Sequence, residues 1–347
     1  MALSKRFGLF TGLLFIFFQG SALEAQTKPA PAYHIVKQFK LGGEGGWDYL
    51  TIDPKARRLY VSHSTHVMVV DADTGAVVGD IPDTSGVHGI AIAEDEGKGY
   101  TSNGRTSTVT VFDLKTLKTL KTIPVGKNPD AIIYDAASKR VFTMNGASKD
   151  STAIDVKTDA VVGTVALGGR PEFAVTDEKG HVFVNLEDKS SIQEFDSRKL
   201  AVEATWPIAP AEEPSGLAFD RKHRRLFSVG SNKLMAVVNA DTGKVVATVP
   251  IGSGVDAAGF DPDTALAFSS NGEGTLTVIH EDSPDKFTVI ENAATQRGAR
   301  TMALDTKTHQ VYLVTAEFGP PPAPTAERPR PRPSIVPGSF ILLVVGK

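Results

Sequence analysis

A unit of about 42 residues that recurs along the chain is the feature that most limits the possible folds. Each copy opens with a turn, continues as a short apolar strand and reaches an Asp-centred or polar turn before a second strand. Seven opening segments can be aligned, and their third residues are Asp48, His88, Asp130, Glu172, Ser215, Asp256 and Arg300, with spacings of 40 to 44 residues. Repeats of this length indicate a solenoid, a propeller or another array.

Each unit contains four short segments with strand character. In the third unit these segments are residues 130–135, 140–145, 152–156 and 161–167, rich in Val, Ile, Phe, Tyr or Thr and bounded by turn residues. Four strands in a period near 42 are typical of propeller blades, so the sequence predicts an all-β, seven-bladed β-propeller. Because no linker separates the repeats, we expect residues 33–347 to form a single domain.

The two ends of the chain favour closure of the ring. The last unit offers only three strands, at residues 301–305, 310–315 and 339–345, whereas residues 34–41 resemble the fourth strand of other units. Pairing this leading segment with the last blade would complete that blade and remove two exposed sheet edges. We therefore expect residues 34–41 to be the outermost strand of the last blade.

Residues 1–25 have the pattern of an export signal. Lys5 and Arg6 precede an apolar run at residues 7–18, and small residues allow cleavage after Ala22 or Ala25. The alternative is a membrane anchor, but the run is shorter than the roughly 20 residues that span a bilayer. The expected mature protein is periplasmic or secreted and has no membrane contact. Without Cys it can form no disulfide and no thiolate metal site.

A Pro- and Arg-rich insertion, residues 318–338, interrupts the last blade between its second and third strands. Its proline content predicts an extended surface loop that stays outside the ladders. Arg328, Arg330 and Arg332 could meet an anionic partner, although a solvated loop without a role is the simpler interpretation.

Two stretches resemble the repeat of the YVTN/YncE-like β-propeller family, namely residues 111–132 and residues 238–252. The namesake Tyr-Val-Thr-Asn is matched loosely by segments that end at His63, Asn103, Asn145 and Asn271. The resemblance covers residues from about 33 to 347. It implies an exported bacterial propeller related in outline to surface-layer and lactonase-like propellers, and it supplies no catalytic motif to transfer.

Apart from Gly230, polar residues recur where the first strand of each unit opens and where the second strand ends, always 15 residues apart. In a blade these positions should face each other at the mouth of the central channel. The pairs are Asp48/His63, His88/Asn103, Asp130/Asn145, Glu172/Glu187, Ser215/Gly230, Asp256/Asn271 and Arg300/Thr315, and Trp47 adjoins the first pair. A wet, polar funnel without a ligand is one interpretation, and a small-ligand site is the other.

Two groups in this funnel have the composition of metal sites. Asp130, Glu172 and Glu187, with the Asn145 amide, would offer the oxygen ligands that suit Ca²⁺ or Mg²⁺. Asp48, His63 and His88 have the ligand types for Zn²⁺. A divalent metal is therefore a candidate cofactor.

The sequence favours a binding or interaction protein that takes a small polar ligand, a peptide or a protein at the funnel face. The alternative is a metal-dependent, lactonase-like hydrolase or a lyase. In that enzyme His63 or His88 would act as general base, and Arg300 would orient the substrate. The net charge of −3 argues against nucleic acid as a partner.

Overall fold

The computed structural model describes residues 1–3, 8, 32–43, 45–323 and 333–347. Most of the expected export signal, and the three arginines of the Pro-rich insertion, lie outside the described residues. Ala32–Lys347 form one compact unit. Among the described residues, no helix combines the length and the apolar character needed to cross a bilayer.

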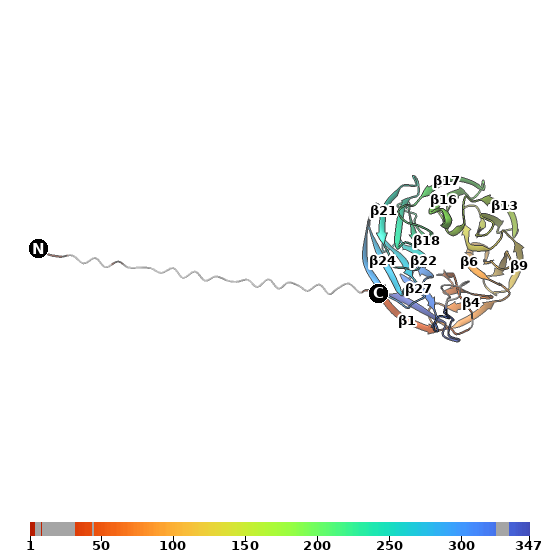
Figure 1. The fold of residues 1–347 in the computed structure, drawn as a ribbon, viewed down its shortest axis with the longest axis horizontal. Coiled ribbons are helices and arrows are strands. Elements are labelled where there is room, and N and C mark those ends of the chain that lie inside the picture. The colour runs from red at the N-terminus through yellow and green to blue at the C-terminus, as the bar shows by residue number, and fades with distance from the viewer. Residues whose placement is uncertain (4–7, 9–31, 44, 324–332) are drawn as a thin grey trace. The chain divides into compact units, whose positions relative to one another are not determined.

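Seven four-stranded antiparallel sheets are arranged in a ring (Figure 1), which confirms the predicted seven-bladed β-propeller. The first four blades, each given from the channel outward, are β2 (Leu50–Asp53), β3 (Arg58–His63), β4 (His66–Asp71) and β5 (Val77–Ile81); β6 (Val87–Ala93), β7 (Lys98–Asn103), β8 (Thr108–Asp113) and β9 (Thr119–Pro124); β10 (Pro129–Asp135), β11 (Arg140–Asn145), β12 (Asp150–Asp155) and β13 (Ala160–Ala166); and β14 (Pro171–Thr176), β15 (His181–Leu186), β16 (Ser191–Asp196) and β17 (Ala201–Pro207).

The remaining three blades follow the same order from the channel outward. They are β18 (Pro214–Asp220), β19 (Arg225–Gly230), β20 (Leu234–Asn239) and β21 (Val245–Pro250); β22 (Val255–Asp261), β23 (Leu266–Asn271), β24 (Thr275–Ser283) and β25 (Lys286–Ala294); and β26 (Met302–Asp305), β27 (Gln310–Thr315), β28 (Ile341–Gly346) and β1 (His34–Lys40). Two short 3-10 turns, η1 (Glu94–Glu96) and η2 (Glu187–Lys189), complete the described elements.

The N-terminal strand closes the ring as predicted. β1 pairs antiparallel with β28, from His34 opposite Gly346 to Lys40 opposite Ile341. In Figure 1 the red-orange β1 lies beside the blue C-terminal strands. A second closure is ionic, because Arg57 of the first blade contacts the fully buried Asp305 of the last blade. The two ends of the repeat array are therefore joined by a ladder and by a buried charge pair.

An aromatic residue at the same place in every second strand fills the space between blades. The seven residues are Tyr60, Tyr100, Phe142, Phe183, Phe227, Phe268 and Tyr312, and each is completely buried. Several contact an aromatic ring of the following blade, as Tyr60 does with Phe112 and Phe142 does with Phe195. Burying one such side chain contributes about 1.5–3 kcal/mol. This repeated aromatic explains why the first residue of the YVTN-like segment recurs.

The Asp residues that follow the first strands cap the next turn. Asp135 accepts hydrogen bonds from the backbone N–H and the hydroxyl of Ser138, and Asp53 accepts from two backbone N–H groups. Asp135 also accepts the hydroxyl of Ser197 from the following blade. These buried carboxylates therefore both form turns and connect neighbouring blades.

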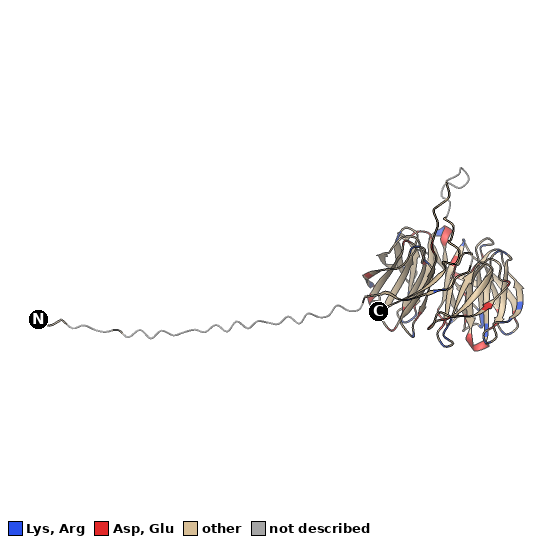
Figure 2. Cartoon of the chain, turned by 90° about the horizontal axis from the view of Figure 1, so that it is seen from below, with Lys and Arg blue, Asp and Glu red and all other residues tan. Residues whose placement is uncertain are grey.

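The described ends of the Pro-rich insertion, residues 318–323 and 333–338, lie between β27 and β28, and Figure 2 shows the ring from the side. These two ends pair with each other, because Phe318 and Ile335 form an antiparallel bridge and Gly319 donates its N–H to the Ser334 carbonyl. This contact is an isolated bridge outside the seven sheets, so the described ends of the insertion join no blade ladder. The paired ends hold Phe318 and Ile335 beside the channel mouth.

Candidate functional site: the mouth of the central channel

In the second, third and sixth blades the predicted facing of residues 15 positions apart is wrong by one residue. Asn103 pairs with Val87, Asn145 with Pro129, and Asn271 with Val255. In these three blades the register then shifts at a bulge within the first strand, whereas the paired residues of the first and last blades show no such shift. Because a shift of one residue moves a side chain to the other face of a strand, the two predicted positions of these three blades do not face each other in the channel.

The strand-end asparagines lie inside their blades. Asn103, Asn145 and Asn271 are at most 1% exposed. The Asn145 amide nitrogen donates to Asp150 and Thr152, at 2.6 and 2.9 Å, and its oxygen accepts from Thr143 at 2.9 Å. Asn103 and Asn271 make the same pattern with hydroxyl-bearing neighbours. Their amides fasten the second strand to the third rather than facing a ligand.

His63 is also enclosed within its blade. Its side chain is fully buried, and neither ring nitrogen has a hydrogen-bond partner among the described residues. Its ring lies edge-on to Phe340, with ring centroids 4.7 Å apart. Burial lowers the pKa of His63 and keeps the imidazole neutral. This placement separates His63 from the predicted set with Asp48 and His88.

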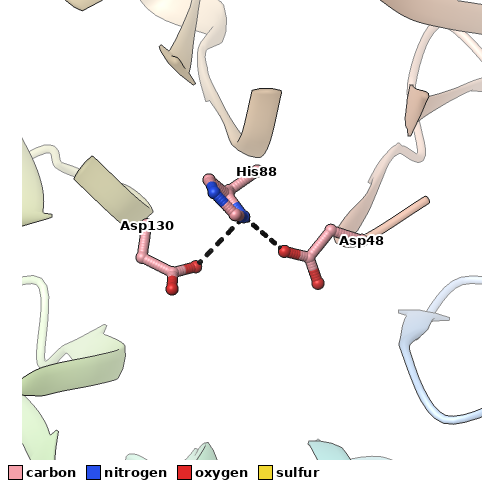
Figure 3. A group of neighbouring side chains, drawn as sticks. All are labelled: Asp48, His88 and Asp130. Carbon is pink, nitrogen blue, oxygen red and sulfur yellow. Dashed lines mark hydrogen bonds and ion pairs between the residues drawn. The ribbon is translucent and has the colours of Figure 1, made fainter. Parts of the chain in front are cut away.

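The opening residues of three neighbouring blades do converge on the channel (Figure 3). His88 lies between Asp48 and Asp130, and its Nδ1 is 2.6 Å from Asp48 Oδ2 and 3.7 Å from Asp130 Oδ1. Burial favours the neutral imidazole, but the hydrogen bond with Asp48 and the charge of Asp130 outweigh it, so the pKa of His88 is raised. The ligand atoms of these three residues lie within 4.8 Å of one another.

Glu172 and Asp256 add two further carboxyl groups to this mouth. Burial, reinforced by the neighbouring carboxylates, raises the pKa of Glu172 to about 8 and that of Asp256 to about 7. Burial also raises the pKa of Asp130 to about 6, although His88 opposes the shift. The mouth therefore gathers Asp48, Asp130, Glu172 and Asp256 in surroundings where a full set of negative charges is unfavourable. Bound protons or a bound cation would reduce the repulsion among these carboxylates.

Tyr49 lies close to the carboxyl groups of this acidic mouth. It belongs to the first blade, yet its ring lies 5.3 Å from the ring of Phe173 on β14 of the fourth blade. Burial and four nearby carboxylates, led by Asp130, raise the pKa of Tyr49 well above its usual value, so the hydroxyl stays protonated and can donate. A second cavity of about 300 Å³ is lined by Ile90, Ile133 and other residues, most of them on the inner strands.

Glu187 lies with Arg170 rather than with Asp130. Glu187 opens η2, beyond the end of β15, and its carboxylate forms an ion pair with the Arg170 guanidinium. The same guanidinium is 3.2 Å from Glu172. Among the described residues, neither predicted metal set occurs as a group with converging ligand atoms, whereas Asp48, His88 and Asp130 do.

A pocket of about 470 Å³ adjoins the acidic mouth. Trp47, Phe318 and Ile335 provide its apolar walls, and Arg297 and Arg300 provide its cationic groups; Gly46, Gly254, Gly272, Gly298 and Pro333 complete the lining. Arg300 Nη1 lies 3.0 Å from Asp256 Oδ2, so one guanidinium belongs to both the pocket and the mouth. The pocket therefore places positive charge and aromatic surface directly beside a group of carboxyls.

Several residues of this site were not predicted from the sequence. Tyr49 and Arg170 adjoin predicted positions, but nothing local shows that Tyr49 contacts the fourth blade or that Arg170 pairs with both Glu172 and Glu187. Arg297 and Phe318 reach the pocket through the turn before β26 and through the base of the insertion. The available signal was the insertion itself, since long loops in compact domains are often functional.

Solved structures of similar architecture share the ring. A chain from the crystal structure of a mitotic checkpoint complex aligns with a TM-score of 0.74 and 16% identity, over 96% of this chain and 99% of that chain. The WD40 repeats of RRP9 give 0.72 and 8%, over 90% and 97%, and U3-55K gives 0.71 and 8%, over 90% and 98%. At these identities the likeness shows the fold alone. No protein-family model and no curated protein sequence matches the chain.

Proposed function

We propose that this seven-bladed propeller is an exported binding protein of the YVTN/YncE-like type that takes a zwitterionic small ligand at the channel mouth. The chemical class is an α-amino acid or a short peptide with an apolar or aromatic side chain. The export signal read in residues 1–25 supports a periplasmic or secreted location, and the repeats quoted above support the family.

The raised carboxyl pKa values at the mouth carry this proposal. Asp130, Glu172 and Asp256 lie where burial and mutual repulsion disfavour their charged forms. An ammonium group in their midst would restore charge balance and would favour the ionised carboxylates. Perturbed carboxyl groups that converge in a concave site are a recognised mark of functional sites.

The adjoining pocket supplies the complementary half of the ligand site. Arg300 offers a planar donor pair of the kind that holds carboxylates, and its contact with Asp256 places cationic and anionic protein groups side by side. This close juxtaposition matches an ammonium and a carboxylate that are separated by one carbon. Trp47 and Phe318 would then cover the ligand side chain.

Three related probes test the proposal: L-phenylalanine, N-acetyl-L-phenylalanine and L-phenylalanine amide, each titrated calorimetrically against the mature protein. We expect the free amino acid to bind best, because acetylation removes the ammonium group and amidation removes the carboxylate. Dipeptides with a free N-terminus extend the series.

Matched variants separate the two halves of the site. Asp130→Asn should weaken the binding of L-phenylalanine and of L-phenylalanine amide, which both carry the ammonium group. Arg300→Ala should weaken the binding of L-phenylalanine and of N-acetyl-L-phenylalanine, which both carry the carboxylate. Glu212→Gln, an exposed acid near the same face, is the control and should leave every affinity unchanged. Equal binding of all three probes, or no binding of any zwitterion, would refute the proposal.

A metal-dependent hydrolase is the second candidate, and the Asp48, His88 and Asp130 group favours it. Two carboxylates and an imidazole with converging ligand atoms could hold a divalent ion such as Zn²⁺. Such an ion would supply an activated water for lactone or ester cleavage. Metal analysis of chelator-treated, tag-free protein after reloading, with hydrolysis of a γ-lactone as readout, tests it. Activity that needs the metal and disappears in Asp130→Asn would favour the enzyme over the binding protein.

A further inference from the structure

A second cluster of side chains that could hold a metal ion lies at the junction of the fifth and sixth blades. Asp220 and His223 belong to the turn between β18 and β19, and Glu281 lies on β24 of the next blade. His223 Nδ1 is 2.7 Å from Asp220 Oδ2 and 3.0 Å from Glu281 Oε1. The three ligand atoms converge within 4.8 Å.

The two carboxylates are deeply enclosed. The side chains of Asp220 and Glu281 are each 2% exposed. Glu281 Oε2 is buried and has no hydrogen-bond partner among the described residues. A buried carboxylate with one oxygen unpartnered carries a large desolvation cost unless a cation or a proton is bound there. The cluster therefore contains a buried carboxylate oxygen that lacks a hydrogen-bond partner among the described residues.

Comparison among the blades shows that Glu281 is exceptional at its position. The residue that follows the third strand, at the place that Glu281 occupies in the sixth blade, packs against the turn of the preceding blade. In five other blades it is small, apolar or a hydroxyl: Ala72, Leu114, Val156, Ser197 and Ala240. None of these five residues carries a carboxylate, whereas Glu281 brings one to Asp220 of the fifth blade.

His223 departs from the repeat at the same junction. Three residues after the Asp that ends the first strand, the third, sixth and seventh blades carry Ser138, Thr264 and Thr308, and each hydroxyl donates to its own Asp. The fifth blade replaces this hydroxyl with an imidazole. Two independent departures from the repeat thus occur together, and both introduce a metal-ligand side chain.

We propose that Asp220, His223 and Glu281 bind a divalent metal ion that joins the fifth and sixth blades. Two carboxylate oxygens and one imidazole nitrogen form a ligand set that suits Zn²⁺. Tetrahedral Zn²⁺ ligands at about 2.0–2.1 Å lie about 3.3 Å apart, so the His223–Asp220 and His223–Glu281 separations of 2.7 and 3.0 Å would need to open by roughly 0.6 and 0.3 Å. The ion would neutralise both buried carboxylates, and His223, which is about one-third exposed, leaves room for a water as fourth ligand.

The first experiment compares zinc binding by the wild type and by Glu281→Gln, with tags removed and metal stripped by a chelator. We expect the wild type to bind one equivalent of Zn²⁺ with a rise of several degrees in Tm, and Glu281→Gln to lose both effects. Without metal, Glu281→Gln should be at least as stable as the wild type, because it removes a buried charge. A purely structural ion pair predicts the opposite: no response to zinc, and a metal-free variant less stable than the wild type.

Two controls locate the ion. His309→Gln disrupts a comparable contact, in which His309 Nδ1 lies 2.7 Å from the buried Asp261, and it should leave the zinc response unchanged. The same titration in Asp130→Asn protein excludes the channel mouth as the source of the response. An anomalous-scattering peak at the zinc edge among Asp220, His223 and Glu281 would establish the site. A peak elsewhere, or zinc binding that persists in Glu281→Gln, would overturn it.

Discussion

Replacing Glu172 with Gln should stabilise the ligand-free protein at neutral pH. Glu172 has an ordinary pKa of 4.5, and in the fold burial and neighbouring carboxylates raise it to about 8. Its side chain is 19% exposed, so solvent screens the effect only partly. Because the folded pKa lies above the unfolded one, ionisation opposes folding. The penalty is absent below about pH 4, grows as the pH rises, and is complete above pH 8.

The magnitude follows from the two pKa values. At pH 7 the penalty is about 3 kcal/mol, and at pH 5 it is below about 1 kcal/mol. For a unit of the size of Ala32–Lys347, 1 kcal/mol corresponds to about 1.5 °C in Tm. Glu172→Gln should therefore raise Tm by about 4–5 °C at pH 7 and by about 1 °C at pH 5.

Differential scanning calorimetry of both proteins from pH 5 to pH 8, without added ligand, measures this difference. Glu212→Gln, exposed on the same face, should show no such pH dependence. The ion pair between Arg170 and Glu172 works in the opposite direction, since its loss would destabilise the variant. A variant that is less stable than the wild type at pH 7, or a difference that does not change with pH, would refute the reasoning about the acidic mouth.

Four further predictions concern the scaffold. Asp305→Ala should destabilise the protein by about 1.5–3 kcal/mol in chemical denaturation, because it removes a buried carboxylate that accepts a charge-assisted hydrogen bond from Arg57 and leaves the more exposed Asp73 as the ion-pair partner of Arg57. Asn145→Ala should cost about 2–3 kcal/mol in the same assay, because three side-chain hydrogen bonds are lost. His63→Leu should keep ligand affinity, measured by calorimetry, and should reduce sensitivity to acid, because the buried neutral imidazole disfavours protonation. Deletion of residues 34–40 should expose the edge of β28 and cause association, detectable by light scattering.

The sequence predicted the architecture because its repeat is a property of backbone pattern and burial. The spacing of the opening segments and the spare strand at residues 34–41 follow from the alternation of apolar and turn residues. The site could be predicted only in part. The opening residues Asp48, His88 and Asp130 come together at the mouth, whereas a bulge in the first strand of the second blade shifts the expected pairing, and Asn103 and its equivalents lie inside the blades. A bulge moves side chains between faces and leaves no clear mark in the sequence.

Long-range contacts were the other limit. Tyr49 reaches Phe173 across the channel, and Glu281 meets His223 from the neighbouring blade. Such meetings depend on the radius and twist of the ring rather than on residue spacing. The repeat nevertheless contained a usable signal, since Glu281 and His223 both depart from the residue types found at equivalent places in other blades.

The most direct test of the account is the number of protons released when L-phenylalanine binds at pH 7. Isothermal titration in two buffers of different ionisation enthalpy gives this number. Because Glu172 and Asp256 have pKa values of about 8 and about 7, a bound ammonium group should displace about one proton or more per ligand. The release should fall in Glu172→Gln. Binding without proton release, or with proton uptake, would contradict the claim that the acidic mouth is a cation-binding site.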